Sequence, residues 1–287
     1  MIAAGRLTQT DIAQALDRLA IARCGPVSSH WIDAGDAADL LFAHDPQAAR
    51  GALEGATRGV DIVVQPQAGR EKKLLVADMD STMITVECID ELADYAGIKP
   101  QIAAVTEAAM RGELDFETAL DARVALLAGL DAGVIDRCLA ERVAIMPGAE
   151  ALVRTMRARG GRAVLVSGGF TRFADPVAAR IGFDRAIANR LMIAEGQLTG
   201  AVERPIVGAE AKRATLLAEC AAAGLHPEQA MAVGDGANDL PMIRAAGLGV
   251  AYRAKPVVAA AADARIAHGD LRALLWAQGI ARADWVE

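Results

Sequence analysis

Short apolar runs that each end in a polar cluster constrain the fold of this chain more than any other feature. The three clearest runs cover residues 74–77, 163–166 and 230–233. Because they are continuous and alternate with helical segments, they predict a parallel sheet covered by helices on both faces, a Rossmann-like α/β fold. Ligands of such sheets bind at the carboxyl ends of the strands, so we expect the polar clusters to form one site there.

The first 70 residues predict a separate, small α+β domain. Its expected elements are a weak strand in 1–7, a helix over 11–20, strands over 27–32 and 39–43, a helix over 45–56 and a strand over 60–64. This order resembles a ferredoxin-like or ACT-like module. The polar segment 65–73 reads as a linker, so we predict domains at 1–70 and 71–287.

An insertion between the first two strands of the larger domain, at about residues 83–144, predicts helices throughout. One of its apolar stripes contains Phe116, Leu120 and Leu127, and Arg123 occupies a position in that stripe where an apolar residue is expected. A buried arginine needs a partner. A helical insertion at the ligand end of the sheet predicts a cap over the site.

The charge balance argues against several classes of partner. A net charge of -7 gives no reason to expect nucleic acid or an anionic membrane surface, since both attract clustered cations. No segment has the length and hydropathy of a signal peptide or a membrane span, which favours a cytoplasmic protein. The four cysteines have neither zinc-ligand nor disulfide spacing. A homo-oligomer is left open.

Two acidic clusters indicate a site for a hard cation. Asp78 and Asp80 follow the first strand directly, and Asp235 and Asp239 follow another. Carboxylates about 4 Å apart repel by roughly 4 kcal/mol at an effective dielectric of 20, so such a pair needs a cation beside it or the protonation of one carboxylate. Oxygen ligands without histidine or cysteine favour Mg²⁺ over Zn²⁺.

The sequence offers once each group that phosphoryl transfer requires. Asp78 can attack phosphorus as the nucleophile, and Asp80 can protonate the leaving hydroxyl and then activate water. Ser167 and the backbone of Gly168 can donate hydrogen bonds to phosphate oxygens, while Lys212 can supply positive charge. Taken alone, Ser167-Gly-Gly also fits a simple tight turn, and Lys212 fits a solvated helix charge.

Four motifs, taken in order, resemble the signature of the haloacid dehalogenase (HAD) superfamily. They are Asp78-Met-Asp-Ser-Thr, Ser167-Gly-Gly, Lys212 and Gly234-Asp-Gly-Ala-Asn-Asp-Leu-Pro. Within that superfamily the cap segments Val86-Glu-Cys-Ile-Asp-Glu and Met110-Arg-Gly-Glu-Leu-Asp-Phe are most similar to the phosphoserine phosphatase family. The resemblance implies hydrolysis of O-phospho-L-serine, a small phosphomonoester, through an aspartyl-phosphate, the last step of serine biosynthesis.

The resemblance also implies a role for each site residue. Asp78 and Asp235, with the backbone carbonyl of Asp80, would bind Mg²⁺. The phosphate would be held by Ser167, Gly168 and Lys212, and Asn238 and Asp239 would support the site. Glu87 and Arg123 would recognise the amino-acid part of the substrate, and Met110 and Phe116 would form an apolar wall of the pocket. By helical spacing alone, Glu87 also fits a solvent-facing glutamate and Arg123 an ion pair within the cap.

Two alternative functions remain from the sequence. A related enzyme would transfer the phosphoryl group to another alcohol, such as homoserine, instead of water. A protein of a different class would sense an amino acid through its N-terminal domain and carry an inactive catalytic domain. The complete set of acids, serine and lysine argues against the second.

Overall fold

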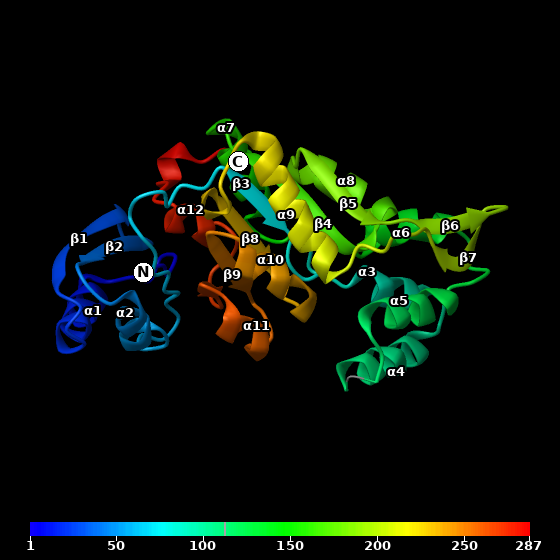
Figure 1. The fold of residues 1–287 in the computed structure, drawn as a ribbon, viewed down its shortest axis with the longest axis horizontal. Helices are drawn as coiled ribbons and strands as arrows, with labels where there is room; N and C mark the ends of the chain where they lie inside the picture. Colours follow the sequence, from blue (N-terminus) through cyan, green and yellow to red (C-terminus); the bar gives the residue numbers. More distant parts are fainter. Residues whose placement is uncertain (112) are drawn as a thin grey trace.

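The computed structural model describes residues 1–111 and 113–287, and for Met110 it describes the backbone only. Its centre is a six-stranded sheet in the order β10-β9-β8-β3-β4-β5, in which every neighbouring pair is parallel (Figure 1). The strands are β3 (Leu74–Ala77), β4 (Arg162–Phe170), β5 (Arg185–Asn189), β8 (Ala230–Gly234), β9 (Leu248–Tyr252) and β10 (Ala264–Ile266). The predicted parallel sheet is confirmed.

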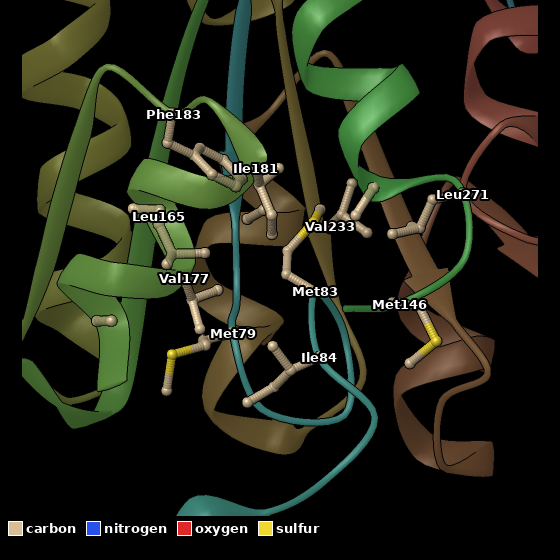
Figure 2. Close-up of a cluster of buried hydrophobic side chains, with 14 of the residues drawn as sticks. Met79, Met83, Ile84, Met146, Leu165, Val177, Ile181, Phe183, Val233 and Leu271 are labelled. Carbon is tan, nitrogen blue, oxygen red and sulfur yellow. The ribbon is translucent and has the colours of Figure 1, made fainter. Parts of the chain in front are cut away.

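Helices cover both faces of this sheet, as predicted. The helices of the core are α7 (Ala149–Ala158), α8 (Thr171–Ile181), α9 (Ala209–Ala223), α10 (Leu240–Ala245), α11 (Pro256–Ala261) and α12 (Ala273–Ala277). Alternate strand residues pack into two different apolar clusters, because successive side chains of a strand point to opposite faces. Leu75 packs with α7, α8 and α12, and Leu74 with α9, α10 and α11. Figure 2 shows Leu165 and Val233 in the first cluster.

The insertion after β3 is helical, as predicted, and a hairpin from elsewhere in the chain packs on it. The helices are α3 (Cys88–Tyr95), α4 (Lys99–Met110), α5 (Phe116–Ala125) and α6 (Gly133–Glu141). The hairpin, β6 (Leu191–Ala194) and β7 (Gln197–Val202), was not predicted. Leu198 of β7 accepts a hydrogen bond from Gly129 and donates one to Leu130, at 2.8 and 2.9 Å. The cap is therefore built from two separate segments (Figure 1).

The N-terminal unit has fewer paired strand residues than the sequence predicts. Antiparallel strands β1 (Pro26–Asp33) and β2 (Ala37–Phe42) lie with helices α1 (Gln9–Ile21) and α2 (Pro46–Leu53). The expected strands over 1–7 and 60–64 are wrong in extent: Ile2 forms single bridges to Ala37 and Asp61. The paired segments nevertheless lie side by side in the order expected of a ferredoxin-like sheet, which is β1, β2, Ile2 and Asp61. Within 60–64 the backbone pairing is that of Asp61 with Ile2, at 2.8 and 2.9 Å, while the Asp61 side chain bonds to the core.

The N-terminal unit is bonded to the core at several points. Arg50 of α2 donates to the carbonyl oxygen of Ala262 at 2.8 Å, and Gln65 donates to that of Ala277 at 2.6 Å. The segment predicted as a linker thus itself contacts the core.

The four cysteines are free and buried. No helix in the described residues has the length and apolar character needed to cross a membrane.

Candidate active site

Asp78 lies where β3 ends and is almost completely buried. Its backbone N–H donates to the carbonyl oxygen of Val233 at 2.9 Å, which continues the pairing of β3 with β8. Its Oδ1 accepts from the N–H of Met79 at 2.8 Å and lies 2.6 Å from Lys212 Nζ. The sheet therefore fixes the orientation of this carboxylate.

Lys212, in the first turn of α9, is fully buried. Its Nζ lies 2.6 Å from Asp78 Oδ1 and 2.7 Å from Asp239 Oδ1. Burial opposes the charge of Lys212, but the two carboxylates outweigh burial and raise its pKa above the ordinary value. The alternative of a solvated surface lysine is wrong, because the whole side chain is buried.

Asp239 is held on both of its oxygens. Oδ1 accepts from Lys212, and Oδ2 accepts from the N–H groups of Asp235 and Gly236 at 3.2 and 3.0 Å. A Cβ atom at Gly234 would lie 2.3 Å from Asp239 Cγ, so this position requires glycine. These contacts fit the supporting role expected for Asp239.

Carboxylates converge at this edge in a way that suits a divalent cation. Asp78, Asp235 and Asp239 each offer an oxygen within 4.8 Å of the others. Burial and repulsion from Asp239 raise the pKa of Asp78 well above its ordinary value, and the same two causes raise the pKa of Asp235 to about 6. One ammonium, that of Lys212, balances only part of this charge. An oxygen donor set with excess negative charge fits a hard divalent ion.

Asp80 stands two residues beyond Asp78, and its Oδ1 atom is buried with no hydrogen-bond partner among the described residues. Burial, and then the charge of Glu87, raise the pKa of Asp80 to about 7. A carboxyl group with this pKa is protonated to a useful extent at neutral pH, which is what a general acid requires.

Ser167 and Gly168 lie in the last residues of β4, not on a turn between strand and helix. Ser167 is buried, and its Oγ accepts from the N–H of Gly169 at 2.8 Å. An ideal Cβ at Gly169 would lie 3.0 Å from Asp80 Oδ2, so the glycine-rich strand end lies beside the acid. Asn238 is half-buried beside Gly236, in the turn that follows β8.

The cap brings an aromatic ring to the same edge. A Cβ built on Gly168 would lie 3.0 Å from Phe116 Cζ, and one built on Gly208 would lie 3.3 Å from Phe116 Cδ1. Phe116 thus covers the end of β4 and the start of α9. The side chain of Met110, the other residue of the expected wall, lies outside the described part of the chain.

Glu87 and Arg123 both belong to the cap, but few bonds hold them. Glu87 is exposed and accepts from the Ser81 hydroxyl at 2.6 Å. Arg123 is half-buried and donates from Nε to the carbonyl oxygen of Ala119 at 3.2 Å. Burial lowers the pKa of Arg123, while the charges of Asp90, Glu87 and Asp80 act in the opposite direction. Among the described residues Arg123 forms no ion pair within 4.0 Å, whereas Arg142 of the same cap pairs with Glu91 and Asp94, so the alternative of an ion pair between Arg123 and a cap carboxylate is wrong.

Two polar residues to which the sequence analysis gave no role also support the site. The hydroxyl of Thr82, in the first motif, donates to Asp235 Oδ1 at 3.0 Å. Asn189 is buried at the end of β5, donates to the carbonyl oxygen of Gly168 at 2.8 Å and accepts from the N–H of Val207 at 2.7 Å. Asn189 follows the apolar residues 186–188, so the strand-end pattern used for the other motifs also applies to it.

Comparisons with known proteins agree with this geometry. A phosphoserine phosphatase of Streptomyces coelicolor is 49% identical over 236 residues, which are 81% of this chain and 57% of that protein. The chain thus spans little more than half the length of that relative. A HAD family hydrolase from Salmonella enterica serovar Typhi is 30% identical with a TM-score of 0.82, over 94% of this chain and 95% of the other.

A solved structure described as a phospho-aspartyl intermediate analogue of phosphoserine phosphatase is 38% identical with a TM-score of 0.67, over 71% of this chain and 98% of the other. The profile of the haloacid dehalogenase-like hydrolases matches residues 75–244, which contain β4, β8, all but the first residue of β3, and all four motifs. The match covers more than half of the chain. This chain therefore belongs to the haloacid dehalogenase-like hydrolase family.

Proposed function

We propose that this chain is a Mg²⁺-dependent phosphoserine phosphatase that hydrolyses O-phospho-L-serine to L-serine and phosphate. The observation that carries the proposal is the pairing of a fixed nucleophile with a nearby acid. Asp78 is oriented by β3 and Lys212, and Asp80 has a pKa of about 7. The named activity of the Streptomyces coelicolor relative supports the choice of substrate.

In the first half-reaction, a carboxylate oxygen of Asp78 attacks phosphorus and forms an aspartyl-phosphate. The bond between phosphorus and the serine oxygen breaks, and Asp80 transfers its proton to that oxygen. Serine leaves as a neutral alcohol. A nucleophile of this kind replaces one difficult displacement by two easier ones.

In the second half-reaction, the ionised Asp80 accepts a proton from water as the water oxygen attacks phosphorus. The bond to Asp78 breaks, phosphate leaves, and Asp80 is again protonated. One residue can serve both steps because its pKa lies near neutrality.

Asp78, Asp235 and the backbone carbonyl of Asp80 would hold Mg²⁺. When bound, the ion supplies positive charge that stabilises the phosphate oxygens in the transition state. Lys212 supplies a second, permanent charge from within the protein. Ser167 and the N–H of Gly168 donate to the remaining phosphate oxygens, with Asn238 and Asp239 keeping the turn after β8 in place.

The cap provides the contacts to the amino acid. Arg123 can bind the carboxylate of phosphoserine through two parallel hydrogen bonds, and Glu87 can pair with its ammonium group. Phe116 and Met110 would exclude water from the closed site. The zwitterion supplies charged partners that neither cap residue has among the described residues.

Phosphate release from phosphoserine, measured with and without Mg²⁺, tests this function. We expect turnover that requires the ion, and much slower turnover of phosphoethanolamine and phospholactate, which lack the carboxylate and the ammonium group respectively. Homoserine added as an acceptor distinguishes hydrolysis from transfer: phosphohomoserine formed in place of free phosphate would contradict the proposal. The place in serine biosynthesis, the cytoplasmic location, the oligomeric state and the domain boundaries at 1–70 and 71–287 stay predictions.

A further inference from the structure

Asp61, in the N-terminal unit, is a buried carboxylate whose partners all lie in the core. Oδ1 accepts from the N–H groups of Ala267 and His268 at 2.8 and 3.1 Å, and Oδ2 accepts from those of His268 and Gly269 at 3.2 and 2.7 Å. The residue is 3% exposed. Three consecutive amides around one carboxylate form an anion site that fixes the backbone of residues 267–269.

Residues 267–269 are the last of three loops that lie side by side at the carboxyl edge of the sheet. Asp235 follows β8, residues 253–255 follow β9, and residues 267–269 follow β10, in the order in which these strands pair. The middle loop is bonded on both sides. On one side, the backbone N–H of Arg253 donates to the carbonyl oxygen of Ile266 at 2.8 Å, and its Nη2 donates to that of Gly269 at 3.4 Å. On the other side, the backbone N–H of Lys255 donates to the carbonyl oxygen of Asp235 at 3.4 Å.

The middle loop needs this support because its backbone is strained. Arg253 has a φ of 46°, in the left-handed region that residues other than glycine rarely adopt. Such a conformation is unfavourable and persists only where its surroundings hold it. The bonds of Arg253 to Ile266 and Gly269 are part of those surroundings, and Asp61 fixes the loop that contains Gly269.

We propose that Asp61 is a positioning residue for Asp235, so that the N-terminal unit contributes to the cation affinity of the catalytic edge. The inference rests on the proposed Mg²⁺ site. Without the carboxylate, the amides of 267–269 lose their shared acceptor and Arg253 relaxes toward an ordinary φ. Lys255 then withdraws its N–H from Asp235, and the metal-binding carboxylate loses its alignment.

Asp33 provides a matched control, because it too connects the N-terminal unit to the core. Its Oδ2 accepts from Trp276 Nε1 at 2.6 Å and from the N–H of Arg282 at 2.8 Å. Neither partner belongs to the loops beside Asp235. Asp33→Ala should therefore weaken the attachment of the unit without disturbing the metal-binding edge.

The test measures Mg²⁺ binding to the full chain by calorimetry, without substrate, in wild type, Asp61→Ala, Asp61→Asn and Asp33→Ala, with Tm recorded for each. We expect Asp61→Ala to raise the Kd for Mg²⁺ about 10-fold, as removal of outer-shell partners of metal ligands does, and Asp33→Ala to leave it nearly unchanged. Asp61→Asn, which keeps one acceptor oxygen, should fall between them. Saturating Mg²⁺ should restore kcat in Asp61→Ala.

Equal increases in Kd for the Asp33 and Asp61 variants would overturn the inference, since attachment of the unit alone would then explain both. An unchanged Kd in Asp61→Ala would also overturn it while leaving the proposed function intact. Failure of the wild-type chain to bind Mg²⁺ would instead remove the metal site on which both proposals depend.

Discussion

The catalytic edge and the cap differ in how their charges are held. Asp78, Lys212 and Asp239 are buried and contact one another at 2.6 and 2.7 Å. Glu87 is exposed, and Arg123 has one side-chain hydrogen bond, at 3.2 Å, among the described residues. Under the proposed function, the difference means that the groups for phosphoryl transfer are in place before substrate arrives, whereas the groups for selectivity obtain their partners from the substrate.

Replacing the nucleophile should have the largest effect. Asp78→Asn keeps the size of the side chain but removes the attacking oxygen anion, so we expect kcat to fall by at least about 10⁴-fold, in the range seen when a nucleophile is removed. Phosphate release measures the loss, and rapid quenching of the wild-type enzyme with labelled phosphoserine should trap label on Asp78. Circular dichroism controls for folding. Substantial turnover in a folded Asp78→Asn variant would exclude the covalent mechanism.

Removing the buried ammonium should have the next largest effect. Lys212→Met leaves Asp78 and Asp239 without their shared cation, so kcat/KM should fall by about 10² to 10³-fold on every phosphate ester. Loss of one partner from a buried ion pair also costs about 3 to 5 kcal/mol of stability, which urea unfolding without Mg²⁺ measures. Arg213→Ala, one residue further along α9 and paired with Glu210 on the surface, is the control. An effect confined to phosphoserine would contradict a general phosphate role.

The cap variants should lose less, and only on the amino-acid substrate. Arg123→Ala and Glu87→Ala leave an unpaired charge on bound phosphoserine, which costs about 1 to 3 kcal/mol, or roughly 5- to 150-fold in kcat/KM. Turnover of a small aryl phosphate should change little, because Asp78 and Lys212 are untouched. Arg142→Ala, whose guanidinium pairs with Asp94 and Glu91 of the cap, controls for cap stability. Equal losses on both substrates would assign the two residues to cap closure.

The strand ends of the catalytic edge and the helices of the cap were both predicted from local sequence patterns. Strand β3 has the predicted bounds, and Asp78 and Asp235 follow strands as expected, because short apolar runs ending in polar residues are a local pattern. Ser167 differs, because β4 continues past it to Phe170. Local patterns also identified the helices of the cap. At Arg123 the interrupted apolar stripe correctly indicated a partly buried charge.

The missed features depend on contacts between distant segments. The hairpin β6–β7 packs on α5, and its only local signal is the turn Glu195-Gly196, in which both residues have positive φ. Asp61 was assigned to a strand because its neighbours are apolar, whereas its side chain bonds to residues more than 200 positions away. Neither periodicity nor spacing carries information about such partners.

The smallest expected effect is a change in pH dependence, because the pKa of Asp80 at the catalytic edge responds to the charge of Glu87 in the cap. This pKa is raised to about 7, chiefly by burial and then by Glu87, so the protonated acid disappears as pH rises through that value. Phosphoserine has a poor leaving group and needs the proton, whereas an aryl phosphate does not. The ratio of kcat/KM for phosphoserine to that for an aryl phosphate should therefore fall up to about tenfold per pH unit above neutrality. Glu87→Gln removes the second cause, so the midpoint of this fall should move to lower pH, while Asp80→Asn should abolish the fall. A midpoint that stays in place in Glu87→Gln would mean that the cap charge does not act on the acid, and the two regions would then be electrostatically independent.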